Sequence, residues 1–374
     1  MDISRRDLFQ VGGKLLVVAS VGATLDQITV TGFLRARFYR TDTIAEQFQE
    51  LMLKGISVPT YEVSAMTMRN VMRYWVRTLE PMHRILKGDL QQFWIDPIRR
   101  RCEELGVAIH TGHQLERLEP SSSGGIARLH FRTGADEPLA TEPDTVLLAM
   151  PFGNVITLLD DALFDAAPAL GQIKYLEARA MAALNIYCKT RIAGIPREHV
   201  NLLQSEYGLS FIDVSQNWSG YNATVLNAIA SDFTSLQGLS DQLAADRLMA
   251  DMRRYLPILT PDSIDRIVFQ NHAVQPLFMN NVGGWAFRPG PRTALSNLYL
   301  CGDYCRSAID LVCMEGAVST GLLAAEAIRA DFKLSPPVEI LKPKEYPTVL
   351  LILGRFALLP LAALAKIVTL ITGS

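Results

Sequence analysis

The feature that most constrains the fold is an apolar run that stops at a glycine and a carboxylate. Residues 297–304 read NLYLCGDY, and a helix-like run rich in small residues, DLVCMEGAVSTGLLAAEAI, begins at residue 310. Glycine lets the backbone approach a ligand closely, and the first N–H groups of a helix have no partner within it. A buried strand, a Gly-Asp turn and a helix start together predict a site for a phosphate-bearing cofactor.

Composition excludes several classes of protein and site. The chain has 374 residues, 49% of them hydrophobic, and a formal charge of −2, which suits one large globular domain or two smaller ones. Its 36 lysines and arginines are scattered, so we predict no nucleic-acid partner. The five cysteines lack the spacing and nearby histidines of a zinc site, so we predict no metal. Their odd number in a large chain favours a reduced compartment, and Cys301 is expected to be an apolar core residue.

A helix is expected over residues 90–105. Phe93, Ile98, Cys102 and Leu105 recur at helical spacing and predict a buried stripe. Gly106 is expected to end this helix.

Short strands are expected after this helix, over residues 107–110, 113–118, 126–131 and 145–150. Ala127, Leu129 and Phe131 alternate and predict one apolar face. The run TVLLAM at 145–150 is continuously apolar, as expected for a strand buried on both faces. This block predicts a nucleotide-binding α/β unit with a small antiparallel insertion.

A second domain, interleaved with the first, is predicted from residues 43–86 and 155–290. The former stretch is rich in helix-forming patterns, and the latter holds strand candidates within 177–187 and 210–227. An amphipathic helix is expected over residues 240–255, with four inward side chains: Leu243, Leu248, Met249 and Met252.

Three stretches in order resemble the flavin-dependent amine oxidase and phytoene desaturase superfamily. They are GDLQQFWID at 88–96 followed by CEELGVAI, DTVLLAMP at 144–151, and residues 297–326. The resemblance extends from residue 87 to residue 330. NVGGWAFRPGPRT, at 281–293, resembles the desaturase branch more than classical amine oxidases.

The resemblance implies an α/β (α+β) fold class: an incomplete glutathione-reductase-type FAD-binding domain interleaved with a substrate domain of mixed sheet and helices. The implied cofactor is FAD. The implied flavin-binding residues are Leu115, Pro151, Gly302, Asp303, Met314, Glu315, Gly316 and Ala317. Trp285, Phe287 and Arg288 are expected to line the substrate pocket, alternatively to be strand packing with one surface cation. No catalytic residue is predicted, because in such a site the flavin carries the chemistry.

The family's dinucleotide fingerprint, a strand followed by G-x-G-x-x-G, has no counterpart in this sequence. Gly12 and Gly13 lack a third glycine at the required distance and a preceding apolar strand. By the resemblance, residue 1 falls after the fingerprint, so half of the flavin site is expected outside these residues. Three explanations stay open: a fragment or late start, a separate subunit that supplies the fingerprint, or a degenerate relative that binds FAD weakly or not at all.

Each end of the chain allows more than one interpretation. SRRDLF at residues 4–9 resembles a twin-arginine export signal, but Lys14 interrupts the apolar run. A mature helix is the favoured reading, with one apolar face formed by Leu8, Val11, Leu15 and Val18.

At the other end, residues 348–373 are long and apolar enough to span a bilayer. Arg355 and Lys366 lie on one helix face, and at mid-bilayer each would cost about 2.5–3.5 kcal/mol. Pro360 would kink or break the helix. We therefore expect this helix to lie in the membrane surface, with packing on the protein itself as the alternative.

These observations predict a division of the chain and a function. The predicted segments are 1–86 (helical part of the substrate domain), 87–154 (FAD-binding segment), 155–294 (substrate domain), 295–332 (closing FAD-binding segment), 333–347 (linker) and 348–374 (membrane-associating helix). The expected function is oxidation or isomerisation of a hydrophobic lipid or isoprenoid by hydride exchange with flavin, at the cytoplasmic side of a membrane as a peripheral protein. A non-catalytic membrane-associated interaction protein and an amine oxidase are the alternatives.

Overall fold

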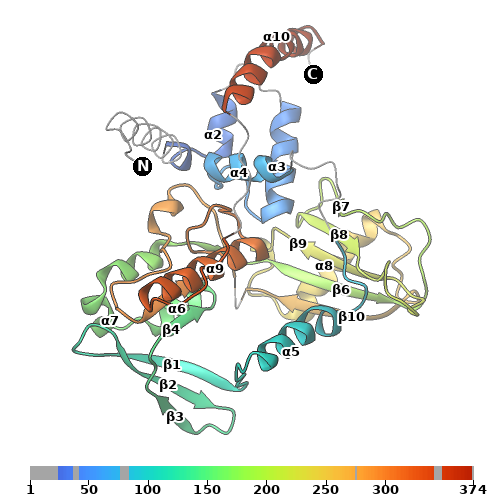
Figure 1. The fold of residues 1–374 in the computed structure, drawn as a ribbon. Helices are drawn as coiled ribbons and strands as arrows, with labels where there is room; N and C mark the ends of the chain where they lie inside the picture. The colour runs from blue at the N-terminus through green and yellow to red at the C-terminus, as the bar shows by residue number, and fades with distance from the viewer. Residues whose placement is uncertain (1–23, 37–41, 76–83, 274–275, 341–347, 373–374) are drawn as a thin grey trace.

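The computed structural model describes residues 24–36, 42–75, 84–273, 276–340 and 348–372. The twin-arginine segment and the helix expected near residues 8–18 lie outside these ranges. The side chains of Arg355 and Lys366 are also outside the described part, although their backbones belong to a helix. Within the described part the fold is mixed α/β, with three hydrophobic cores (Figure 1).

One core surrounds a parallel pair of strands. Strand β12 (Leu298–Cys301) pairs with β4 (Val146–Ala149), with Leu298 opposite Val146 and Cys301 opposite Ala149. All four residues of β12 are buried, because α9 (Met314–Asp331) contacts this strand. Three short helices after β4 share the core: α6 (Phe152–Leu158), α7 (Asp161–Ala166) and η2 (Pro168–Tyr175). Both predicted strands are therefore confirmed, as is the burial of Cys301.

An antiparallel meander precedes β4. It consists of β1 (His113–Pro120), β2 (Ile126–Thr133) and β3 (Pro138–Thr141), in that order in the sheet. The predicted strands near 113 and 126 are confirmed. The strand expected over 107–110 is wrong: this stretch is irregular and exposed, because no described strand offers it a ladder of hydrogen bonds.

A five-stranded antiparallel sheet forms the second core, in the order β10-β6-β9-β8-β7. Its strands are β6 (Ala182–Cys188), β7 (Val200–Asn201), β8 (Leu209–Asp213), β9 (Val225–Ala230) and β10 (Ile264–Asn271). Helix α8 (Asp241–Tyr255) shares this core through Leu248, Met249 and Met252, as predicted. Leu243 is instead exposed, because it lies in the first turn, which Ser240 caps at the surface. Three further short elements are β5 (Ala178–Arg179), η3 (Thr234–Leu236) and β11 (Leu277–Phe278).

Three helices make the third core, above both sheets in Figure 1. They are α2 (Val30–Arg35), α3 (Asp42–Ile56) and α4 (Ala65–Trp75). An isolated antiparallel bridge joins Val63 to Asn281, so this helical layer contacts the segment that leads to β12. The helix-rich character predicted for residues 43–86 is confirmed over α3 and α4.

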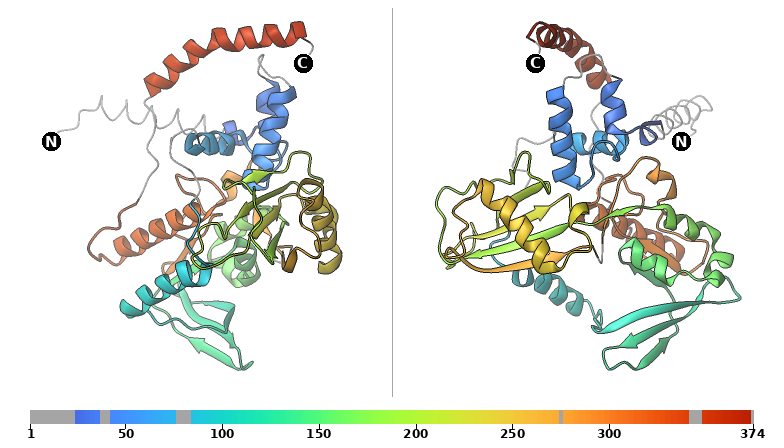
Figure 2. Two further views of the ribbon diagram at one scale, coloured as in Figure 1. Left: turned by 90° about the vertical axis from the view of Figure 1, so that its right-hand side faces the viewer. Right: turned by 180° about the vertical axis from the view of Figure 1, so that it is seen from behind.

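The chain ends in α10 (Thr348–Thr372), which stands apart from the sheets (Figure 2). The sequence predicted a kink or a break at Pro360. The helix continues through this residue, so it does not break there, and Figure 2 shows it curved. Several of its described apolar side chains are exposed, Phe356 and Leu358 among them. The residues that the structure describes contain no helix whose length and apolarity would carry it across a membrane.

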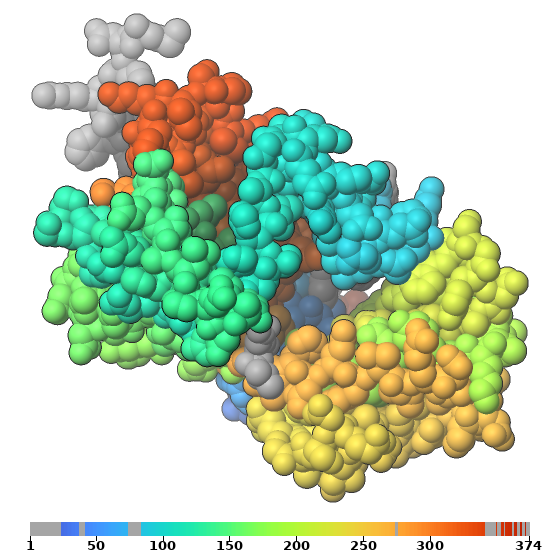
Figure 3. Space-filling view, turned by 90° about the horizontal axis from the view of Figure 1, so that it is seen from below, coloured from blue at the N-terminus to red at the C-terminus, as the bar shows by residue number. Residues whose placement is uncertain are grey.

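Two apolar elements lack the cover that their sequence predicts. The π-helical turn η1 (Gln91–Ile95) and α5 (Asp96–Glu104) have no buried residue, and Ile98 is 51% and Leu105 64% exposed. The buried stripe predicted there is therefore wrong. Strand β4, predicted to be buried on both faces, exposes Leu147 and Ala149. In both cases no described part of the chain packs on the apolar face; Figure 3 shows the residues around α5 at the rim of a hollow.

Candidate functional site

The turn after β12 is held by a hydrogen-bonded clamp from α9. The Thr320 hydroxyl accepts a hydrogen bond from the Gly302 N–H at 3.0 Å and lies 2.9 Å from the Gly302 carbonyl oxygen. Gly302 has φ +147°, a conformation that favours glycine. A Cβ at this position would lie 2.6 Å from the Tyr304 ring. The fold of this turn therefore requires glycine at residue 302, and no side chain covers the backbone there.

Asp303 places a carboxylate at the end of the strand. Its side chain is half-buried, and burial raises its pKa, while the Tyr304 N–H and the Arg288 charge act in the opposite direction. None of the described side chains makes a hydrogen bond with this carboxylate. Asp303 is therefore a partly desolvated acceptor that can receive a hydroxyl donor from a ligand.

The start of α9 is the second part of the site. The Cys313 thiol caps the helix, accepting a hydrogen bond from the Gly316 N–H at 3.3 Å, and burial raises the pKa of Cys313 to about 11, so the thiol stays neutral at pH 7. A Cβ on Gly316 would lie 2.4 Å from the Leu311 carbonyl oxygen, so the preceding loop approaches the helix only because this residue is glycine. Met314 and Glu315 are exposed at the helix tip.

A buried arginine holds the loop between these two parts. The Arg288 guanidinium donates to the backbone carbonyls of Tyr304 (3.0 Å), Asp303 (2.9 Å) and Cys305 (2.8 Å). It also forms an ion pair with Asp310, and both side chains are almost fully buried. One side chain thus connects the segment before β12 with the whole turn that follows it.

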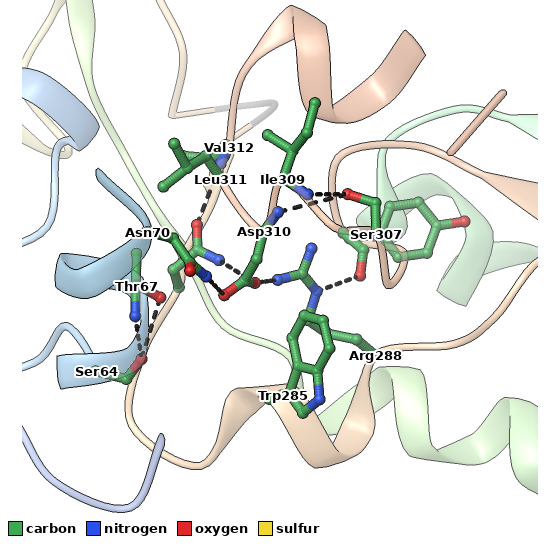
Figure 4. A network of polar contacts seen from close by, with 12 residues as sticks. Ser64, Thr67, Asn70, Trp285, Arg288, Ser307, Ile309, Asp310, Leu311 and Val312 are labelled. Atoms are coloured by element: carbon green, nitrogen blue, oxygen red, sulfur yellow. Dashed lines mark hydrogen bonds and ion pairs between the residues drawn. The ribbon is translucent and has the colours of Figure 1, made fainter. Parts of the chain in front are cut away.

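Asp310 ties the same loop to the helical layer (Figure 4). Asn70 of α4 donates to its carboxylate at 3.0 Å and Asn280 at 3.3 Å, while the Asn280 side-chain oxygen accepts from the Val312 N–H at 3.2 Å. Burial raises the pKa of Asp310 to about 6, against the opposing effect of the Arg288 charge. Asp310 has φ +49°, a strained backbone that this network stabilises.

The structure brings Gly302, Asp303 and the tip of α9 together around this loop. Leu115 lies in β1 opposite Phe131, beside a bulge, and is partly buried against the same core. Pro151 precedes α6 at the carboxyl end of β4 and is exposed.

The three expected pocket residues lie on or just after η4 (Gly284–Phe287). The Arg288 guanidinium is 5.0 Å from the Trp285 ring centroid. The Phe287 ring packs on the Tyr175 ring, with 5.1 Å between their centroids. Arg288 is not a surface cation, which was the alternative reading, because the loop carbonyls and Asp310 enclose it. That these residues line a substrate pocket stays a prediction.

These residues fit part of an FAD molecule. The Asp303 carboxylate suits a ribityl or ribose hydroxyl, and the exposed tip of α9 suits an electron-rich ring edge, because the helix dipole favours negative charge there. The Gly316 and Ala317 N–H groups are not free, because both donate to Cys313. Nothing in the described residues resembles the glycine-rich cradle that a pyrophosphate needs.

Sequence reasoning missed the residues that hold the site in shape. Asn70, Asn280 and Asp310 come from segments as much as 240 positions apart, so no local pattern relates them. The one local signal was Ser307 three residues before Asp310, typical of a side chain that hydrogen-bonds its own turn, as it does to the Asp310 N–H at 3.4 Å.

Comparison with known proteins identifies the family of this chain. Residues 76–329 match the sequence model of the family described as flavin containing amine oxidoreductase. The chain is 29% identical over 259 residues to 15-cis-phytoene desaturase of Solanum lycopersicum, covering 64% of this chain and 41% of that protein. It is 22% identical over 296 residues to zeta-carotene desaturase of Synechocystis sp., covering 73% and 60%. The chain thus spans less than two thirds of the length of either relative.

Solved structures share the fold. An oxidoreductase from Methanosarcina mazei superposes with a TM-score of 0.54 at 13% identity, covering 88% of this chain and 73% of that one. Cyclohexylamine oxidase from Brevibacterium oxydans superposes with a TM-score of 0.53 at 14% identity, covering 83% and 69%. At such identities the likeness concerns the fold alone.

Proposed function

Since this chain belongs to the flavin containing amine oxidoreductase family, whose cofactor is FAD, we propose that it is part of an oxidoreductase. This part binds the substrate and contributes the C-terminal segment of the flavin site. The proposed substrate is a hydrophobic lipid or isoprenoid. The observation that carries the proposal is the Gly302–Asp303 turn, which Thr320 of α9 and the buried Arg288 hold in place. The two desaturase relatives support the substrate class, because both are named for acting on carotenes or their precursor phytoene.

The residues of this chain have positioning roles in that reaction. Asp303 accepts a hydroxyl of the cofactor's sugar-alcohol arm, and the helix dipole of α9 stabilises negative charge at its tip. Arg288 holds the turn that carries Asp303, by donating to three consecutive carbonyls, and ties it to Asp310 in the loop that precedes α9. A bound flavin supplies the hydride chemistry, while the protein orients the substrate and excludes water.

The proposal includes completion of the cofactor site by a dinucleotide-binding segment, in the same polypeptide or a partner. Charge-assisted hydrogen bonds to a pyrophosphate contribute roughly 1.5–3 kcal/mol each. Without two or three of them, FAD affinity falls by about 100-fold or more, since 1.4 kcal/mol corresponds to a factor of ten. Residues 1–374 on their own are therefore expected to retain FAD weakly.

Replacement of Asp303 tests the cofactor assignment. Asp303→Asn keeps the shape but removes the charge that accepts a hydroxyl, so we expect FAD affinity to fall by roughly tenfold or more. The measurement is quenching of flavin fluorescence on titration with the protein. Asp136→Asn is the matched control, because Asp136 is exposed in the turn before β3 at φ +62°, a conformation that asparagine tolerates. Equal affinity of the two variants would refute the assignment.

An amine substrate is the second candidate, favoured by the family's name and by the fold shared with cyclohexylamine oxidase. Substrate-dependent bleaching of the flavin absorbance separates the two classes. A carotenoid precursor in detergent should bleach the flavin of the completed protein, whereas a primary amine should not. The reverse result would establish the amine class.

We further propose that α10 attaches the protein to a membrane surface, as a peripheral protein on the cytoplasmic side. Its described apolar side chains, such as Phe356 and Ile371, are exposed to solvent, and burying them in lipid is favourable. Deletion of residues 348–374 should therefore move the protein from sedimented vesicles to the supernatant. A truncated protein that still sediments with vesicles would exclude α10 as the anchor.

A further inference from the structure

We propose that Asn185 and Asn227 recognise a hydroxyl group, so that the ligand of this protein is a long-chain alcohol of the isoprenoid or lipid class. The inference rests on the proposed function, because it names the chemical class of the substrate. Three features of the described chain lead to it: a sheet face beside a hollow, aliphatic side chains around the two amides, and amide groups without partners.

The five-stranded sheet has one covered face and one open face. Helix α8 shares a hydrophobic core with the first face, to which Leu184, Phe211 and Ala228 belong. Figure 2 shows α8 in front of the sheet when the molecule is seen from behind, so Figure 1 shows the opposite face. On that side Figure 3 shows a hollow between the sheet and the residues around α5.

The two asparagines lie at the centre of the open face. Asn185 of β6 is directly opposite Asn227 of β9, and these two strands lie in the interior of the sheet. Side chains alternate between the faces of a strand, so both amides point away from the face that carries Leu184 and Ala228. Both side chains are partly buried.

The neighbours of this pair on the open face are aliphatic. Val268 of β10 lies opposite Asn185, and Ile212 of β8 lies opposite Asn227. Val268 is 41% exposed, and Ile212 and Ile229 are partly buried. A sheet face that water solvates is usually polar, whereas ligand sites combine apolar side chains with a few polar groups. The composition of this face therefore fits an apolar ligand with one polar group.

The two amides keep hydrogen-bonding capacity that the described chain does not use. Asn227 Nδ2 donates to Asn185 Oδ1 at 2.9 Å, and no other side-chain hydrogen bond joins either amide to a described residue. The pair therefore presents Asn185 Nδ2 as a free donor and Asn227 Oδ1 as a free acceptor. Exchanging nitrogen and oxygen in both amides reverses the roles of the two residues and leaves the same set. A hydroxyl matches this set, because it can accept from one group and donate to the other.

The position of the pair requires a long ligand if the same molecule is to reach the cofactor site. Ala178 of β5 packs on the core that surrounds β12. The chain from residue 178 to residue 185 spans at most about 25 Å when fully extended, which sets an upper limit on the separation. A hydroxyl held at the pair thereby fixes which part of a long chain lies at the flavin.

The test measures binding of geranylgeraniol, and of the hydrocarbon with the same skeleton but no hydroxyl, to residues 1–374 in detergent without FAD. Isothermal titration gives the affinities, and hydrogen exchange gives the location. We expect the alcohol to bind roughly tenfold more tightly and to protect β6 and β9. Equal affinities, failure of the alcohol to bind, or protection confined to other segments would overturn the proposal. Oleyl alcohol, titrated alongside, shows whether the isoprenoid skeleton or a lipid chain is preferred.

Variants of the pair separate recognition from a structural role. Asn185→Leu and Asn227→Leu keep the approximate shape and remove the amide, so each should weaken alcohol binding by roughly tenfold. Hydrocarbon binding should stay the same or become tighter, whereas damage to the fold would weaken both ligands. Asn217→Leu is the matched control, because Asn217 is exposed in the loop between β8 and β9. Its affinity for the alcohol should stay within about twofold of the parent. Equal losses for both ligands in the pair variants would contradict the proposed recognition.

Flavin reduction in the completed protein distinguishes this proposal from the proposed function. Preferential binding of the alcohol through the pair, without any reduction of flavin, supports the recognition site and refutes the oxidoreductase assignment. Flavin bleaching by the alcohol and the hydrocarbon alike, unchanged in Asn185→Leu, refutes the recognition site and leaves that assignment intact.

Discussion

The β12–α9 segment and the η1–α5 segment have similarly clear patterns in the sequence and opposite fates in the structure. All four residues of β12 are buried, whereas no residue of η1 or α5 is. The difference is the neighbour: β12 lies between β4 and α9, whereas the apolar side chains of α5 stay exposed in the described structure. An apolar stripe in the sequence therefore shows which side chains could be buried. Whether they are buried depends on another element that packs on them.

The largest expected contrast concerns arginines in the two regions. Arg288→Met leaves Asp310 buried without its charge partner and removes the donor to three carbonyls, so we expect a loss of about 3–5 kcal/mol in the free energy of unfolding. Arg99→Met on α5 breaks an exposed pair with Glu103, and such pairs contribute about 0–1 kcal/mol. Denaturant unfolding at pH 7 measures both. Similar losses would mean that the buried network does not stabilise the loop.

A pair of leucines gives the next contrast. Leu300→Ala empties a fully buried position in β12 and should lower the free energy of unfolding by about 2–5 kcal/mol. Leu105→Ala, at the end of α5, should change it by no more than about 0.5 kcal/mol, because the side chain is mostly exposed. Denaturant unfolding measures both variants. Similar losses for the two variants would show that burial does not distinguish the two positions.

The same contrast explains how far the sequence could predict this molecule. Strands β4 and β12, helix α8 and the Gly302–Asp303 turn were predictable, because alternation, apolar runs and glycine positions are local signals. The spacing of Phe93, Ile98 and Leu105 also predicted an apolar stripe. Whether these side chains are buried depends on which other part of the protein packs on them, and the spacing does not show that. The network of Asn70, Asn280, Arg288 and Asp310 was unpredictable for a related reason: its members lie far apart in the sequence and meet only in the folded structure.

The smallest expected effect is a difference in pH dependence between a fully buried and a partly buried carboxylate. Burial raises the pKa of Asp310 from 3.8 to about 6, so between these values the folded state keeps a proton that the unfolded chain has lost. The stability that this group contributes is present below pH 3.8 and falls as the pH rises through 6. Glu119 of β1 is only partly buried, and its hydrogen bond to His130 lowers its pKa, so its contribution instead falls as the pH drops. The difference in the free energy of unfolding between wild type and Asp310→Asn should decline from pH 4 to pH 6.5, and that for Glu119→Gln should rise. A difference for Asp310→Asn that grows with pH would show that the Arg288 charge outweighs burial at this carboxylate, and that the loop is held mainly by the ion pair.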